Sequence, residues 1–203
     1  MPTKSVFPTK IYIEQLEHYR KLNKGLLHDI EILSQKDLEG IAWSKQHYQG
    51  GYTSYSSITD LHERFPDFIE LRKAIDKHVK KYARSLNWDL MGRKLHMTVS
   101  WVSMMPKSTY HTMHTHPLSV ISGTYYIDIP KGSSALKLED PKMPFLMNAP
   151  PRKANAKAEE QNYLHIPAKN GQLVLFESWM RHEVPPQPVS NNRVSFSFNY
   201  EWF

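Results

Sequence analysis

Apolar and polar positions divide the chain into a helical first half and a β-rich second half. Between residues 14 and 33 the apolar residues recur every three or four positions, and the same period returns from Pro66 to about Leu86. From residue 95 onward, apolar and polar positions alternate in short runs such as 95–105 and 193–202, which is typical of strands. The pattern therefore predicts a mainly β protein with N-terminal helices.

We predict a single domain over residues 1–203. Residues 1–94, with a short strand at 7–12, form a helical preface packed on the sheet, and residues 95–203 form the β core. A long segment at 141–170, rich in Pro, Ala and Lys, interrupts this core. Loops of this length in a compact domain are usually functional covers or disordered, so we expect either a mobile cover at the mouth of a site or disorder.

Residues 40–57 break the helical period before the second helix. Aromatic residues alternate there with Gly and Ser around two consecutive glycines: Trp43, Tyr48, Tyr52 and Tyr55. Aromatic side chains on flexible backbone suit a lid or a substrate wall. A packing loop with half-buried tyrosines is the alternative.

The last predicted strand presents one apolar and one polar face. Its two sets of alternating side chains are Val194, Phe196, Phe198 and Tyr200 on one face, and Arg193, Ser195, Ser197 and Asn199 on the other. A charged residue at the head of a polar interior face needs an anionic partner, because burial of an unpaired guanidinium is too costly. Arg193 is therefore a candidate anchor for an acidic ligand.

Histidines provide the candidate metal ligands. His114 and His116, two positions apart on an extended strand, would point to the same face and hold one ion. His182 would supply a third ligand from the end of the apolar strand at 172–177. In a chain with 11 histidines such a pair also arises by chance at a solvated strand end, but Arg193, 11 positions beyond His182, favours the metal site. Three ligands on one face leave positions open for a co-substrate and oxygen.

Composition narrows the possible classes. With no cysteine, the chain has no thiolate metal site, disulfide or cysteine nucleophile, which leaves histidine and carboxylate as ligands. A hydrophobic content of 40% with 23% charged residues is ordinary for a globular protein. No leader peptide or membrane span is recognisable, so we expect a cytoplasmic protein without a membrane partner.

The net charge of +6 raises the possibility of nucleic-acid binding. Much of this charge lies at 67–81, where acidic residues are interspersed, which is typical of a solvated helix face. No nucleic-acid-binding motif is present, and nucleic acid is disfavoured as a partner. A small molecule or a peptide is the expected partner, and the charge is compatible with an anionic one.

The order of these segments resembles the Fe(II)/2-oxoglutarate-dependent oxygenases, closest to the prolyl-hydroxylase-like branch and its small microbial members. The resemblance covers residues 95–202, about half of the chain, and rests on these segments in order: His114-x-His116, Ser122–Ile127, Gly171–Phe176, His182 and Arg193-x-Ser195. It implies a double-stranded β-helix, or jelly roll. It also implies Fe(II) held by His114, His116 and His182, and 2-oxoglutarate held by Arg193 with Ser195 and Tyr126.

The chain departs from the family pattern at His116, where most members carry Asp or Glu. The three-histidine site has one negative charge fewer, which should hold a dianionic co-substrate well but stabilise oxidised iron less. The nearby carboxylates of Asp128, Glu139 and Asp140 are expected at solvated strand ends or turns.

The resemblance implies a hydroxylase that converts 2-oxoglutarate and oxygen to succinate and carbon dioxide while it oxidises a C–H bond. Its substrate could be a peptidyl side chain, an amino acid or a small metabolite. Two alternatives stay open: a cupin-type three-histidine dioxygenase that needs no co-substrate, and a non-catalytic jelly-roll binding module. The pair Arg193 and Ser195 argues against the cupin type, which has no need of this anchor.

Overall fold

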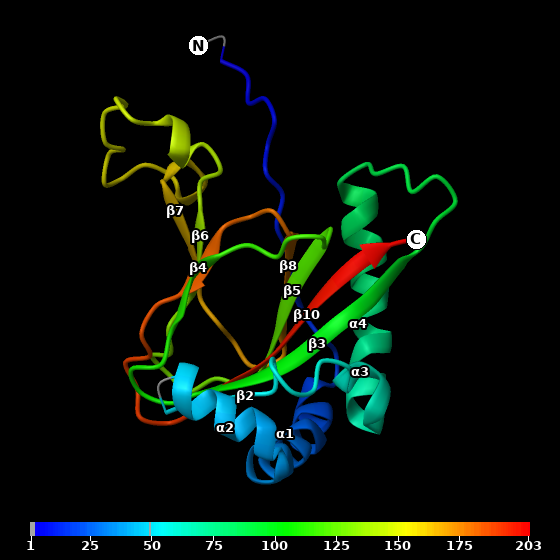
Figure 1. Cartoon of the computed structure of the whole chain (residues 1–203). Coiled ribbons are helices and arrows are strands. Elements are labelled where there is room, and N and C mark those ends of the chain that lie inside the picture. Colours follow the sequence, from blue (N-terminus) through cyan, green and yellow to red (C-terminus); the bar gives the residue numbers. More distant parts are fainter. Residues whose placement is uncertain (1–2, 49) are drawn as a thin grey trace.

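The computed structural model describes residues 3–48 and 50–203 (Figure 1). The helices are α1 (Tyr19–Lys36), α2 (Leu38–His47), α3 (Leu61–Arg64) and α4 (Pro66–Ser85), with short 3-10 turns at Met143–Phe145 and Ala158–Glu160. The strands are β1 (Tyr12–Gln15), β2 (Tyr52–Thr53), β3 (Leu95–Met105), β4 (His111–His114), β5 (Ile121–Asp128), β6 (Leu136–Glu139), β7 (Tyr163–Ile166), β8 (Gln172–Glu177), β9 (His182–Val184) and β10 (Arg193–Trp202).

The strands form two antiparallel sheets. The larger sheet has the order β1-β8-β5-β10-β3-β2, and the smaller one has the order β4-β9-β6-β7. Helices α1 and α4 cover one face of the larger sheet, where Ile30 and Phe68 are fully buried in one cluster with Phe196. A second apolar cluster, which includes Phe176 and Val184, fills part of the space between the sheets. The expectation of a mainly β protein with N-terminal helices is confirmed.

Strand β10 divides its side chains as the sequence pattern predicts. Its apolar residues belong to the core under the helices: Val194, Phe196, Phe198 and Tyr200. Its polar residues line a cavity on the opposite face: Arg193, Ser195, Ser197 and Asn199. The polar face of the central strand is thus the floor of a pocket.

Several expected boundaries were wrong. The first strand lies at Tyr12–Gln15 instead of 7–12, and the first helix begins at Tyr19. Helix α2 occupies part of the segment at 40–57 that was expected to be irregular; residue 49 of that segment lies outside the described residues. The long segment at 141–170 contains β7, which pairs with β6 from Leu136 to Glu139, so part of it belongs to the smaller sheet.

None of the helices in the described ranges is long and apolar enough to span a membrane.

Candidate metal centre

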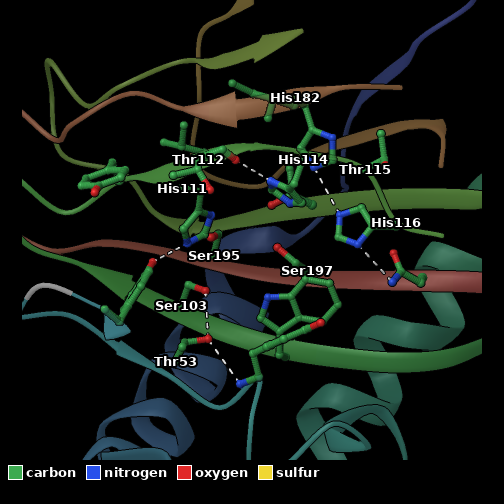
Figure 2. Close-up of a pocket in the computed structure, with 18 of the residues that line it drawn as sticks. Thr53, Ser103, His111, Thr112, His114, Thr115, His116, His182, Ser195 and Ser197 are labelled. Atoms are coloured by element: carbon green, nitrogen blue, oxygen red, sulfur yellow. Dashed lines mark hydrogen bonds between the residues drawn. The ribbon is translucent and has the colours of Figure 1, made fainter. Parts of the chain in front are cut away.

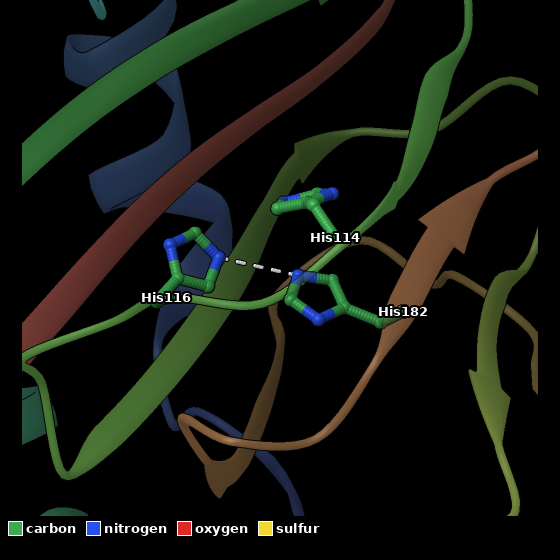
Figure 3. Close-up of side chains that lie close together, drawn as sticks. All are labelled: His114, His116 and His182. Carbon is green, nitrogen blue, oxygen red and sulfur yellow. Dashed lines mark hydrogen bonds between the residues drawn. The ribbon is translucent and has the colours of Figure 1, made fainter. Parts of the chain in front are cut away.

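Three histidines converge between the two sheets (Figure 3). One ring nitrogen from each of His114, His116 and His182 can be chosen such that all lie within 4.8 Å of one another. The Nε2 atoms of His116 and His182 are 3.2 Å apart. The structure therefore brings together the three residues that the sequence proposed as ligands.

The route by which the chain assembles this cluster differs from the expected one. His114 is the last residue of β4 and pairs with His182, the first residue of β9. His116 lies beyond the end of β4, where its backbone N–H donates to the carbonyl oxygen of Ser178 at 3.1 Å. His114 and His116 thus do not share one extended strand, and His182 follows a turn after β8 and begins a strand of its own.

Hydrogen bonds orient each ring. Nδ1 of His114 is 2.6 Å from the carbonyl oxygen of Thr112, and Nδ1 of His182 is 2.9 Å from that of Met180. A carbonyl can only accept, so both Nδ1 atoms carry the proton and both Nε2 atoms are unprotonated and able to bind a metal. Nδ1 of His116 instead lies 3.3 Å from the side-chain amide nitrogen of Asn199.

Burial keeps two of the ligand candidates, His116 and His182, neutral. Burial and the neighbouring His114 lower the pKa of His116 to about 4. Burial, again the largest cause, lowers the pKa of His182 to about 3. Neutral imidazole is the form that binds a metal ion, and a set of three imidazole nitrogens fits a divalent transition metal.

A cavity of about 600 Å³ opens beside the cluster (Figure 2). Its described lining holds the triad, the polar face of β10 and a set of aromatic residues: Trp43, Tyr48, Tyr55, Trp101 and Tyr110. No Asp or Glu is found among these lining residues. Its volume lies within the range of about 300–1,000 Å³ usual for small-molecule sites.

The nearby carboxylates lie elsewhere. Asp128 is exposed at the end of β5, and Asp140 accepts a hydrogen bond from the backbone N–H of Lys142. Glu139 was expected at a solvated position but is buried, and its carboxylate pairs with Arg181 at 2.5 Å. None of the three belongs to the cluster of possible metal ligands in the described residues.

Arg193 is buried without an anionic partner in the described part of the chain. Its side chain is 2% exposed, and its Nη1 lies 3.3 Å from Oγ of Ser195 and 3.5 Å from the sulfur of Met105. Its Nε atom has no hydrogen-bond partner there. The ring of Tyr126 lies against the guanidinium, with a distance of 4.9 Å from Cζ to the ring centroid. Tyr126 is itself fully buried and, unlike Arg193 and Ser195, is not among the lining residues.

Among the cavity residues without a predicted role are His111, Trp101 and Asn199. His111 and Trp101 lie on β4 and β3, and Asn199 lies on the polar face of β10. The alternation of β10 could have pointed to Asn199. His111 has a weaker signal, three positions before His114, because a bulge between these residues obscures which face each presents.

Comparisons with known proteins agree with this geometry. Residues 99–199 match the sequence profile of a family described as "Putative 2OG-Fe(II) oxygenase". A search of curated protein sequences gave no match. Among solved structures, the chain is similar to a prolyl-4-hydroxylase from Pseudomonas putida, with 14% identity, a TM-score of 0.61 and coverage of 95% of this chain and 92% of that one.

It is also similar to HygX from Streptomyces hygroscopicus, a structure with nickel and 2-oxoglutarate bound, with 11% identity, a TM-score of 0.62 and coverage of 95% and 82%. The chain spans only 58% of the length of a 2OG-Fe(II) oxygenase family oxidoreductase from Burkholderia pseudomallei, with 12% identity, a TM-score of 0.49 and coverage of 68% of this chain. The profile match identifies residues 99–199 of the chain as belonging to the Fe(II)/2-oxoglutarate-dependent oxygenase superfamily.

Proposed function

We propose that this protein is an Fe(II)- and 2-oxoglutarate-dependent hydroxylase. The observation that carries the proposal is Arg193, a buried cation without a carboxylate partner in the described residues, in the same cavity as the three histidines. A buried guanidinium is costly unless an anion pairs with it. The distal carboxylate of 2-oxoglutarate supplies that anion when its keto acid end lies at the metal.

Each residue of the candidate site has a defined role in this proposal. His114, His116 and His182 hold the metal through Nε2. Arg193 binds the distal carboxylate with its planar guanidinium, and Ser195 donates a further hydrogen bond to it. The ring of Tyr126 packs against the guanidinium and fixes its position. Bound iron supplies the oxidative chemistry, while the protein orients the co-substrate and excludes water.

The cavity lining favours a substrate whose reacting region is uncharged. Trp101 lies beside His116, with ring centroids 5.7 Å apart, and Tyr55 meets the indole edge to face at 5.1 Å. The described lining offers hydroxyl, amide and aromatic groups but no carboxylate to pair with a cation. A peptidyl side chain, an amino acid or a small metabolite would be oxidised next to this aromatic wall.

The arrangement of the two sheets around the three histidines also supports a proposal for the fold. We infer that the two sheets are the walls of a double-stranded β-helix, with the triad at its open end, and that residues 1–203 form one domain. Helices α1 and α4 share a core with the larger sheet, which supports the single domain.

Succinate formation tests the function. Protein with Fe(II), ascorbate and 2-oxoglutarate should release succinate slowly even without a substrate, and Arg193→Ala should abolish this release. Oxygen consumption that is independent of 2-oxoglutarate would instead support the cupin-type dioxygenase. Metal binding with neither activity would support a non-catalytic module.

A further inference from the structure

Two further histidines, His47 and His111, line the cavity beside the triad, and His111 is paired with a tyrosine. The hydroxyl of Tyr48 lies 2.5 Å from Nε2 of His111, and the two ring centroids are 5.2 Å apart. Both side chains line the cavity. His111 comes from β4, while Tyr48 follows α2, outside the residues that match the family profile. The helical half of the chain thus contributes directly to this site.

The proton positions of this pair follow from its surroundings. Burial, with a smaller effect from the charge of Arg193, lowers the pKa of His111 to about 3. Burial raises the pKa of Tyr48, so the phenol keeps its proton at neutral pH. A phenol hydroxyl is a stronger donor than a neutral imidazole N–H, so Tyr48 donates to Nε2 of His111. The ring proton of His111 is then on Nδ1.

Nδ1 of His111 has no hydrogen-bond partner among residues 3–48 and 50–203, although its ring borders the cavity. Figure 2 draws this ring on the same side of the cavity as Ser195 and away from His116. Arg193 and Ser195 line the same cavity as His111 and Tyr48. An anion bound by Arg193 would therefore lie beside an N–H donor held in a fixed direction.

We propose that His111 is a further binding residue for the distal carboxylate of the co-substrate, and that Tyr48 is the positioning residue that fixes its ring. This inference rests on the proposed function. A carboxylate accepts about four hydrogen bonds. The fork of Arg193 and the hydroxyl of Ser195 provide about three of these, which leaves one for a neutral donor.

Close packing holds Tyr48 in place. A Cβ atom at Gly51 would lie 2.7 Å from a ring carbon of Tyr48 and 2.7 Å from the carbonyl oxygen of Met104. The backbone N–H of Gly51 also donates to the carbonyl oxygen of Tyr48 at 2.8 Å. Only glycine at this position leaves room for the ring, so the orientation of the Tyr48 hydroxyl is tightly defined.

The test compares two 2-oxo acids that differ only in the distal carboxylate. 2-Oxoglutarate and 2-oxopentanoate are titrated against the anaerobic Fe(II) protein in wild type, His111→Phe and Tyr48→Phe. His111→Phe should weaken 2-oxoglutarate binding about tenfold or more, as expected for a lost hydrogen bond to a charged group. Tyr48→Phe should weaken it less. Neither variant should change iron content, unfolding midpoint or the binding of 2-oxopentanoate.

Tyr52→Phe is the matched control. It removes a phenol that donates to Asp37 at 2.9 Å in the same segment, and Tyr52 is not one of the cavity lining residues. It should leave the binding of both acids unchanged. Wild-type affinity for 2-oxoglutarate in His111→Phe, or a loss of iron or of unfolding midpoint that accompanies weaker binding, would overturn the proposal. If the wild type itself failed to bind 2-oxoglutarate, the proposed function would fall together with this inference.

Discussion

The Nε2 atoms of His116 and His182 lie 3.2 Å apart. Two nitrogens each about 2.1 Å from one ion are about 3.0 Å apart at a right angle and about 3.4 Å apart at the tetrahedral angle. The two rings therefore already have the separation of ligands to a single ion. His114 reaches the same point from the strand that pairs with His182.

We expect each of His114→Ala, His116→Ala and His182→Ala to lower metal occupancy sharply, because each removes one of three donors. Elemental analysis of protein loaded with Fe(II), or with Mn, Co, Ni or Zn in its place, measures the loss. His165→Ala is the control, since His165 is an exposed histidine on β7. Full occupancy in the triple alanine variant would show that other residues hold the metal.

His116→Asp separates a ligand role from a bystander role. The carboxylate restores the set that most family members carry, so metal occupancy should stay at the wild-type level, and turnover of 2-oxoglutarate should survive or rise. His116→Ala should lose metal. Equal, undiminished occupancy in both variants would mean that a residue other than His116 completes the site.

Asn199 should set the orientation of His116 when metal is bound. With Nε2 on the metal, Nδ1 of His116 carries a proton, so Asn199 must turn its amide oxygen toward the ring. Asn199→Leu should weaken metal affinity about 10- to 100-fold, as is usual for the loss of such a supporting hydrogen bond. Asn199→Asp should retain affinity because its carboxylate accepts the same proton. Competition with a chelator gives the affinities, and equal values for Asn199→Leu and wild type would contradict this role.

Arg193→Ala should leave metal occupancy intact but weaken 2-oxoglutarate binding by at least about tenfold, because a hydrogen bond to a charged group contributes about 1.5–3 kcal/mol. Arg193→Lys should recover only part of this loss, since a point charge cannot reproduce the planar fork. Anaerobic titration of the Fe(II) protein measures both. Unchanged affinity in the alanine variant would move the assignment toward the cupin-type dioxygenase.

His62 should make stability depend on pH away from the metal site. Burial lowers its pKa, and its Nδ1 lies 2.8 Å from Oγ of Ser100. Below its ordinary pKa of about 6.5, the unfolded chain binds a proton that the folded protein disfavours, so the free energy of unfolding falls as the pH drops through this value.

Without His62, the free energy of unfolding should therefore fall less steeply as the pH drops. Chemical denaturation of wild type and His62→Gln at about pH 7 and about pH 5 gives the two slopes. An identical pH dependence in both proteins would show that His62 titrates normally in the fold.

The sequence predicted those features that are encoded locally. The bounds of β3, β8 and β10 agree with the alternation of apolar and polar residues, and Pro66 begins α4 as expected. Helix α2 was not foreseen, because its apolar residues do not form a regular stripe. His182 was predicted at the end of β8 but begins β9, because the short turn between these strands has no glycine or proline to mark it.

The candidate site was predictable where its members are close in sequence or share one strand face. Arg193 and Ser195 could be placed from the period of β10 alone. Tyr48 and His111 are 63 positions apart and meet only through the packing of α2 against the cavity. Such a contact depends on how elements stack, which periodicity along the chain does not encode.

The place of β10 in the larger sheet has a consequence for biosynthesis. It lies between β5 and β3 although it follows both in the chain, so residues up to Trp202 must leave the ribosome before the gap between its two neighbours can close. Until then β3 and β5 each present an unpaired edge, which is an opportunity for pairing with other chains. Because Arg193 lies on this strand, the residue proposed to bind the anion joins the three histidines only when β10 has paired with its two neighbours.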